Sequence, residues 1–98
     1  MAPYESLDLA RCFGENVLLT RRLADLSQEE LGFLASLHRT EIGQLERGVR
    51  LARIDTVVKL AGALEVPPGD LLKGMAWKPS RAPNGKFITR APAKRRKG

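Results

Sequence analysis

The 98-residue sequence contains only one cysteine and one histidine, Cys12 and His38, and no ligand spacing typical of a metal site. A single cysteine cannot form an intramolecular disulfide, which fits a reducing compartment. Glycine-rich phosphate loops are absent as well. We therefore expect no enzymatic activity, no metal and no cofactor, and we assign His38 to a capping or phosphate-binding role.

Long apolar segments are also missing. No apolar run approaches the roughly 20 residues of a membrane-spanning helix. The N-terminal stretch MAPYESLDLA is acidic and lacks the long apolar core of a secretory signal. We therefore expect no membrane partner and a chain that stays in the compartment where it is made.

Acidic residues are absent after Trp77, so the net charge of +6 is unevenly spread. Nine Lys and Arg residues face 11 Asp and Glu residues in positions 1–77, which makes this part slightly acidic. The remaining eight basic residues are Lys78, Arg81, Lys86, Arg90, Lys94, Arg95, Arg96 and Lys97. Their segment either attracts phosphate without sequence preference or serves as a solvated tail.

Length and composition predict one small domain with two flexible ends. We place a flexible arm at 1–5, the folded domain at 6–76 and a basic, mostly flexible tail at 77–98. Pro, Gly, Ser, Lys and Arg dominate the tail, which is typical of mobile segments. A short hairpin that brings Phe87 toward Trp77 is also predicted. Asn84 and Gly85 are a preferred pair for a tight turn, and the residues after them favour a strand.

A capping box marks the start of the central helix, because Ser27 is followed three residues later by Glu30. From Gln28 onward, an apolar stripe at helical spacing consists of Leu31, Leu34 and Ala35. Gly32 lies in the middle of this short helix, where it costs about 1 kcal/mol relative to Ala. Close approach of a neighbouring helix would explain the glycine.

A second short helix is predicted from Arg39 to Arg47, with Ile42 and Leu45 as its apolar side and Gly48 as its left-handed end. Its exposed side is polar. Arg side chains bind guanine, Gln binds adenine and Thr contacts thymine in the major groove of DNA. The two helices together predict a helix-turn-helix whose second helix reads DNA, with Arg39, Thr40, Gly43, Gln44 and Arg47 on the exposed side.

Three further helices complete the predicted fold, an all-α, compact five-helix domain. They span about Leu7–Leu23, with Ser6 as the cap, Ile54–Leu64 and Pro68–Leu72. The residues expected in their apolar faces are Leu9, Ala10, Phe13, Val17, Thr20, Ile54, Val57, Val58, Ala61 and Leu64.

The run LSQEELGFLASLHRTEIGQLERGVR resembles the lambda-repressor-like DNA-binding domain of the Xre/Cro family. It carries the signature L-S-Q-x-x-L-A, a turn, and I-x-x-x-E-x-G, and its LHRT link is similar to that of restriction-modification controller proteins and actinobacterial regulators. The resemblance covers roughly residues 13–75. The sequence departs from the usual pattern where Asp25 and Ser36 replace glycines and Gly32 replaces alanine.

The resemblance implies roles for individual residues. Gln28 would contact backbone phosphate, and the residues facing the bases would be Arg39, Thr40, Gly43 and Gln44. Arg21 would form a structural ion pair with Glu46. Residues around the fifth helix would form a dimer contact, with the candidates Val66, Leu71, Leu72, Met75 and Trp77; alternatively, Leu71 and Leu72 close the core of the monomer.

The sequence therefore predicts a bacterial, cytoplasmic and nucleoid-associated regulator of transcription that binds specific double-stranded DNA. We expect a homodimer on a palindromic operator. Phosphate contacts would come from Gln28, His38, Arg47, Arg50 and Arg53. The alternative is an antitoxin-like or adaptor protein whose C-terminal tail binds a protein partner or nucleic acid.

Overall fold

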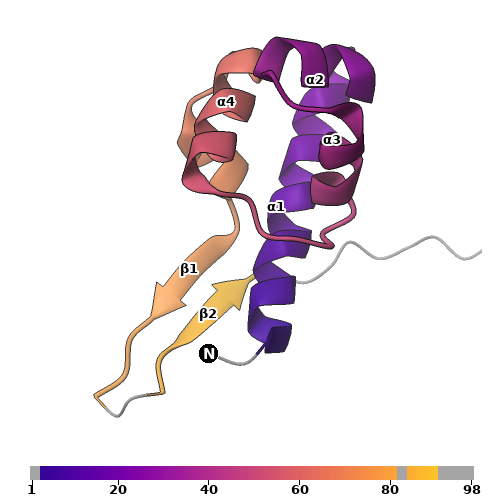
Figure 1. Ribbon diagram of the computed structural model, residues 1–98. Coiled ribbons are helices and arrows are strands. Elements are labelled where there is room, and N and C mark those ends of the chain that lie inside the picture. Colours follow the sequence, from indigo (N-terminus) through magenta and orange to yellow (C-terminus); the bar gives the residue numbers. More distant parts are fainter. Residues whose placement is uncertain (1–2, 82–83, 91–98) are drawn as a thin grey trace, which may run out of the picture.

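The computed structural model describes residues 3–81 and 84–90, with side chains from Asp8 onward. Within these residues, Figure 1 shows a body of four α-helices from which a two-stranded sheet projects. The helices are α1 (Pro3–Leu23), α2 (Gln28–Ala35), α3 (Arg39–Glu46) and α4 (Ile54–Leu64). After them follow a 3-10 helix, η1 (Pro68–Leu72), and the antiparallel strands β1 (Met75–Lys78) and β2 (Lys86–Thr89).

The core lies where α1 and α4 meet the α2–α3 pair and η1. Helix α1 packs against α3, η1 and β2, and α2 packs against α3 and α4. Because α2 and α3 have only eight residues each, this packing must hold them in place. The buried core side chains are Phe13, Val17, Leu31, Ala35, Ile42, Leu45, Leu60, Ala61, Leu64 and Leu71.

The prediction of five α-helices in an all-α fold is wrong in two respects. The fifth helix is the 3-10 helix η1, in which Asp70 N donates to Pro67 O at 2.9 Å. The segment spans only five residues, and 3-10 helices typically occur as such short segments. The sheet formed by β1 and β2 is a further departure from the all-α class.

Helix α1 begins at Pro3, before the predicted start at Leu7. Proline suits the first turn of a helix because its fixed φ matches helical geometry and its missing N–H would be unpaired there. Residues 3–5 of the predicted arm are therefore helical, whereas residues 1 and 2 lie outside the described range. Helix α3 ends at Glu46, one residue before the predicted end, and Gly48 adopts the expected left-handed conformation.

Three residues that were expected in the core are exposed. Leu34 has 54% of its surface exposed, Ile54 83% and Val58 56%. A helix buries only part of its circumference, and α4 turns Thr56, Leu60 and Leu64 inward. Ala61 and Leu64 lie in the core and Val57 packs against it, as predicted, so the inward face of α4 is shifted toward Thr56 and Leu60 and away from Ile54 and Val58.

A close contact explains Gly32, as predicted, but it is made mainly by the link between α2 and α3 and not by a neighbouring helix. A Cβ atom at this position would lie 2.6 Å from Leu37 O, so a larger residue would push the link away. Ser36 and Asp25, at positions where the family resemblance leads us to expect glycine, adopt the left-handed conformation, with φ of 55° and 58°. This conformation is uncommon for residues with a side chain.

The strands β1 and β2 form the hairpin that the sequence suggested. Trp77 lies opposite Phe87, with ring centroids 4.9 Å apart and ring planes inclined by 69°. Asn84 and Gly85 do not form a two-residue turn between the strands, however, because the last pair of the ladder is Lys78 with Lys86, which are too far apart in the sequence. Pro79 cannot donate to the ladder, which accounts for the early end of β1. The basic residues at 94–97 lie outside the described range.

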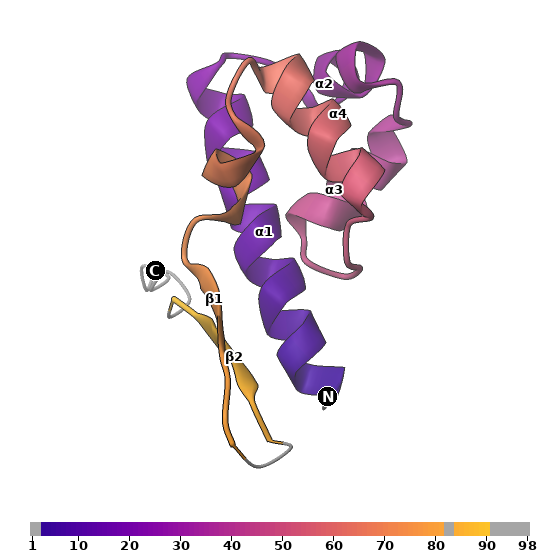
Figure 2. The ribbon, with the colours of Figure 1, turned by 90° about the vertical axis from the view of Figure 1, so that its left-hand side faces the viewer.

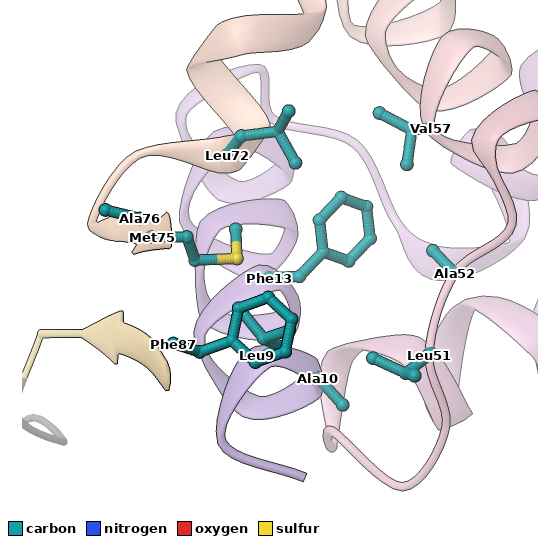
Figure 3. A pocket seen from close by; sticks show the side chains of 10 residues that line it. All are labelled: Leu9, Ala10, Phe13, Leu51, Ala52, Val57, Leu72, Met75, Ala76 and Phe87. Carbon is teal, nitrogen blue, oxygen red and sulfur yellow. The ribbon is translucent and has the colours of Figure 1, made fainter. Parts of the chain in front are cut away.

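An open apolar pocket of about 340 Å³ lies between α1, the link before α4, α4 itself, η1 and the hairpin. Figure 3 shows its side chains converging from these elements; they are Leu9, Ala10, Phe13, Leu51, Ala52, Val57, Leu72, Met75, Ala76 and Phe87. Two of the predicted dimer residues, Leu72 and Met75, are thus part of this pocket. None of the helices in the described part of the chain has the length and apolarity needed to cross a membrane.

Candidate nucleic-acid interface

The capping box predicted at Ser27 fixes the start of α2. Glu30 N donates to Ser27 Oγ at 2.9 Å, and Ser27 N donates to Glu30 Oε1 at 2.8 Å. The pKa of Glu30 is lower than its ordinary value. The main cause is the hydrogen bond with the Ser27 backbone, and the hydrogen bond with the Ser27 side chain adds to it. Gln28 is consequently held at the first position of α2, next to the exposed side of α3.

His38 begins α3 as its N-cap residue. Its Nδ1 accepts a hydrogen bond of 3.0 Å from Thr40 N. In a neutral imidazole the other nitrogen, Nε2, then carries the proton and is a donor. Because His38 is exposed, this donor faces solvent at the edge of α3, where a phosphate oxygen is a suitable acceptor.

The exposed side of α3 and the start of α2 enclose a shallow hollow of about 260 Å³, lined by Gln28, Arg39, Thr40, Gly43 and Arg47. Four of the five residues predicted for the reading side of α3 thus meet in one place, together with Gln28. The fifth, Gln44, is one residue further around the helix and is half-buried. The side chains offer hydrogen-bond donors and acceptors of the kinds that recognise base edges.

Gly43 forms the floor of this hollow. A Cβ atom there would lie 3.1 Å from Arg47 Nη1 and 3.8 Å from Gln28 Oε1. Gly43 is buried next to these two side chains and has no side chain of its own to offer a ligand. The absence of a side chain at Gly43 leaves the space in which the side chains of Arg47 and Gln28 come close to α3.

A network of three side chains ties the hollow to the core. Glu46 accepts from Arg21 Nε at 2.6 Å and from Arg21 Nη2 at 2.9 Å, the ion pair that the family resemblance implied. The side chains of Arg21 and Glu46 are only 12% and 4% exposed. Hydrogen bonding to Glu46 raises the pKa of Arg21 above its ordinary value. Gln28 Nε2 also donates to Glu46 Oε1, at 2.9 Å, which leaves its second amide hydrogen available for a ligand.

Arg50 contacts two side chains of α3. Its Nη1 donates to Gln44 Oε1 at 3.3 Å, and its Nη2 lies 3.6 Å from Glu41 Oε2. Arg50 therefore connects Gln44, a predicted base reader, to Glu41, a residue that the sequence analysis did not single out. Charge and spacing alone gave no signal for Glu41, because the contact depends on how the chain turns after Gly48.

Arg53 pairs with a residue of α4 and not with α3. Its Nε lies 3.3 Å from Asp55 Oδ1, and both side chains are largely exposed. An exposed pair of this kind contributes little to stability, so Arg53 can exchange Asp55 for another anion at small cost. Arg39 and Arg47, in contrast, form no ion pair with any residue in the described ranges, which leaves their positive charge open to an anionic ligand.

Asn16 was missed by the sequence analysis. Its side chain is buried in α1, and Nδ2 donates to Leu71 O and to Lys73 O, both at 2.9 Å. It therefore fixes η1 and the root of the hairpin against α1. A polar residue beside the apolar stripe of α1 was the available signal.

The predicted dimer residues divide into two groups. Leu71 is completely buried, so it belongs to the core and its assignment as a dimer contact is wrong. The hydrogen bond from Asn16 to Leu71 O holds η1 against α1, and the Leu71 side chain packs in the core. Val66 and Met75 are half-buried against the core. Leu72 and Trp77 are exposed, with 46% and 52% of their surfaces accessible, and remain candidates.

The described part of the chain contains no group of three or more His, Cys, Asp or Glu residues that could hold a metal ion. The interface is instead a surface of hydrogen-bond donors and arginines on a pair of capped helices. Such a surface suits recognition of an extended polar ligand.

Comparison with known proteins agrees with this geometry. The helix-turn-helix family model matches residues 19–71. The control protein C.BamHI of Bacillus amyloliquefaciens is 44% identical over 61 residues, which cover 61% of this chain and 75% of the relative. The restriction-modification controller protein C.AhdI from Aeromonas hydrophila has a TM-score of 0.62 at 39% identity, covering 63% of this chain and 94% of that chain.

A third similar protein was solved with DNA. The P22 c2 repressor protein in complex with a synthetic operator has a TM-score of 0.59 at 29% identity, and the match covers 63% of this chain and 94% of that chain. The family match includes α2, α3 and the whole polar hollow. This chain therefore belongs to the helix-turn-helix family and is a DNA-binding regulator of transcription.

Proposed function

We propose that the protein is a homodimer that binds a palindromic operator in double-stranded DNA. In this arrangement each protomer inserts α3 into a major groove, and the two grooves lie about one helical turn, roughly 34 Å, apart. The observation that carries the proposal is the hollow at α3, where hydrogen-bond donors and acceptors surround Gly43. The bacterial cytoplasm, at the nucleoid, is the location that follows.

Base recognition is assigned to four residues of α3. Arg39 binds the O6 and N7 atoms of a guanine, and Gln44 binds an adenine. Each good bidentate contact of this kind is worth about 1–3 kcal/mol of discrimination against the wrong base. Thr40 contacts a neighbouring base edge or a thymine methyl group, and Gly43 lets the helix approach the bases closely.

Phosphate binding is assigned to residues at the rim. Gln28 donates its second amide hydrogen, and His38 donates from Nε2. Arg47 and Arg53 add positive charge next to the groove. Arg50 has a double role, because it contacts phosphate while its hydrogen bond to Gln44 orients that side chain. These contacts hold the protein in register but carry no sequence information themselves.

The dimer contact is assigned to the apolar surface around the pocket of Figure 3. Leu51 and Leu72 line this pocket and are both about half exposed. Trp77 follows on the adjoining strand, and the partly buried Val66 and Met75 support the surface from below. A folded body of this size buries a limited core, so covering these leucines by a second copy adds stability.

The biological role follows from the relatives. C.BamHI is described as a control protein and C.AhdI as a restriction-modification controller protein. We assign a controller role of the same kind to this chain, namely regulation of transcription at an operator that it recognises directly.

Selection of bound sequences from a random pool of duplex DNA tests this function. The full chain at near-physiological salt should enrich a palindrome whose half-sites lie one helical turn apart. Arg39→Ala should relax the preference at one base pair per half-site, while retaining the rest of the sequence. Enrichment of no sequence, despite salt-sensitive binding to the pool, would refute a specific operator, and equal losses on selected and random DNA would refute the role of Arg39.

A further inference from the structure

The hairpin formed by β1 and β2 concentrates positive charge. Residues 74–90 contain four basic residues and no Asp or Glu. One of the four, Arg90, is paired with Glu15 at 3.3 Å. The other three, Lys78, Arg81 and Lys86, are exposed and form no ion pair with any residue of the described ranges. The outer half of the hairpin is therefore an uncompensated cationic surface.

Two of these charges face each other across the sheet. Lys78 and Lys86 are direct partners in the antiparallel register, so their side chains leave the same face of the hairpin. Like charges at directly opposed positions destabilise a sheet. An anion bound between the two ammonium groups removes this repulsion. A polar hollow lined by Lys78, Pro79, Ser80, Asn84 and Lys86 lies at this end of the hairpin.

The hairpin is anchored firmly enough to present these charges in a defined place. Arg90 donates to Lys73 O at 3.0 Å and contacts Glu15 of α1, and the edge-to-face pair of Trp77 and Phe87 spans the two strands. Gly74 leaves room for Arg90, because a Cβ atom there would lie 2.7 Å from Arg90 Nη1. The lysines therefore stand on a supported ribbon, which lowers the entropic cost of binding.

The cationic end lies away from the reading helix. Helix α1 packs against α3 on one side and against β2 on the other, and in both views it stands between them (Figures 1 and 2). The strands also lie outside residues 19–71, the segment that the family model matches. The charge on the hairpin is thus an addition to the shared domain, on a separate surface.

We propose that Lys78, Lys86 and Arg81 form a second, sequence-independent binding site for the phosphate backbone of duplex DNA. Lysine ammonium groups bind phosphates as point charges, and such binding releases condensed counterions. Duplex DNA is the polyanion to which a DNA-binding regulator is held at high local concentration, so it is the ligand that this site meets most often. The site goes beyond operator reading, because it does not need α3.

The test removes base reading first and then neutralises the hairpin. In the background Arg39→Ala with Gln44→Ala, the full chain is titrated with random-sequence duplex DNA at several salt concentrations. Two double variants are compared in this background: Lys78→Gln with Lys86→Gln, and the control Lys59→Gln with Lys73→Gln. Both change the net charge equally, and the control lysines are exposed but lie outside the hairpin.

The expected result is a change in salt dependence that only the hairpin variant shows. Each phosphate contact contributes about 0.9 to the slope of log K against log salt, so losing two contacts should flatten the slope by about 1.8. The control should keep the slope of its background. Equal slopes for the two double variants would overturn the proposal, because duplex phosphate would then not be bound at the hairpin.

The fold is checked on the same samples. Removing the repulsion between Lys78 and Lys86 should leave the melting temperature unchanged or raise it, so a weaker interaction with DNA cannot be ascribed to unfolding. The outcome is also independent of operator selection. A flattened slope without an enriched palindrome would refute the proposed operator and support the hairpin site. An enriched palindrome without a flattened slope would support the operator and refute the hairpin site.

Discussion

Glu46 at the end of α3 is held by Arg21 of α1 through two hydrogen bonds, of 2.6 and 2.9 Å. Because Glu46 also accepts from Gln28 of α2, one carboxylate connects three helices. The orientation of α3, the proposed reading helix, therefore depends on an ion pair that is largely buried beneath the proposed DNA-binding surface.

Replacing Glu46 by Gln should lower stability more than surface substitutions do. The change leaves the largely buried Arg21 without a charged partner, and we expect the free energy of unfolding to fall by about 1–3 kcal/mol. Urea unfolding followed by circular dichroism measures this loss. Glu29→Gln, on the exposed side of α2, is the control and should change stability by less than about 0.5 kcal/mol. Similar changes in the free energy of unfolding for the two variants would show that the Arg21–Glu46 ion pair contributes little to stability.

Arg50→Ala should alter sequence preference as well as overall affinity. Arg50 donates to Gln44 Oε1, so its removal frees the side chain that is assigned to an adenine. We expect the preference to relax at the same base pair that Gln44→Ala affects, measured by selection from a random pool. Arg53→Ala is the comparison and should weaken all sites alike. If Arg50→Ala also weakened all sites alike, Arg50 would be a phosphate contact only.

Ser36→Gly should stabilise the domain. Ser36 has a φ of 55°, and the left-handed conformation costs a residue with a side chain about 1–2 kcal/mol. Glycine adopts it without this cost, although it gains freedom in the unfolded chain. We expect a net gain of about 1 kcal/mol in thermal or urea unfolding. A loss of stability would mean that the Ser36 side chain makes a compensating contact.

Stability at acid pH should depend on Glu30. Its pKa is lower in the folded chain than in the unfolded chain, because the Ser27 backbone and side chain hydrogen-bond to its carboxylate. A depressed pKa gives stability that is present above the unfolded-state pKa and is lost as pH falls through the folded-state pKa. Glu30→Gln should therefore flatten the decline in stability below about pH 5 relative to the parent chain. Parallel pH profiles for the two chains would contradict this linkage.

Leu71 and Leu72 are neighbours with different predicted effects. Leu71→Ala should cost about 2–5 kcal/mol of stability, because it opens a cavity in the core.

Leu72→Asp should leave the monomer folded, since this side chain is half exposed, but should convert the dimer to monomers in sedimentation experiments. A parent chain that is already monomeric, or a dimer that survives Leu72→Asp, would refute the assigned dimer contact.

The α2–α3 unit could be predicted because its signals are local. The Ser27–Glu30 capping box, the tight contact at Gly32 and the left-handed Gly48 are each set by neighbouring residues, and the structure confirms all three. The Arg21–Glu46 pair is not local, and it was expected only from the family resemblance.

Features that depend on the tertiary arrangement were predicted poorly. Apolar spacing in α4 marked Ile54 and Val58 as core residues, but which side faces inward is decided by how α4 meets α1 and α2. The hydrogen bond between Arg50 and Gln44 and the anchoring of Arg90 on α1 join residues through long, flexible side chains, for which sequence patterns carry no signal.

Trp77 is the only tryptophan of the chain and stands on β1, next to Phe87 and apart from the helical core. Its fluorescence therefore reports on the sheet alone, whereas far-ultraviolet circular dichroism reports mainly on the helices. The protein thus contains its own optical label for one of its two parts. Coincident melting curves from the two signals would mean that sheet and helices unfold as one cooperative unit, and separate curves would measure the stability of each.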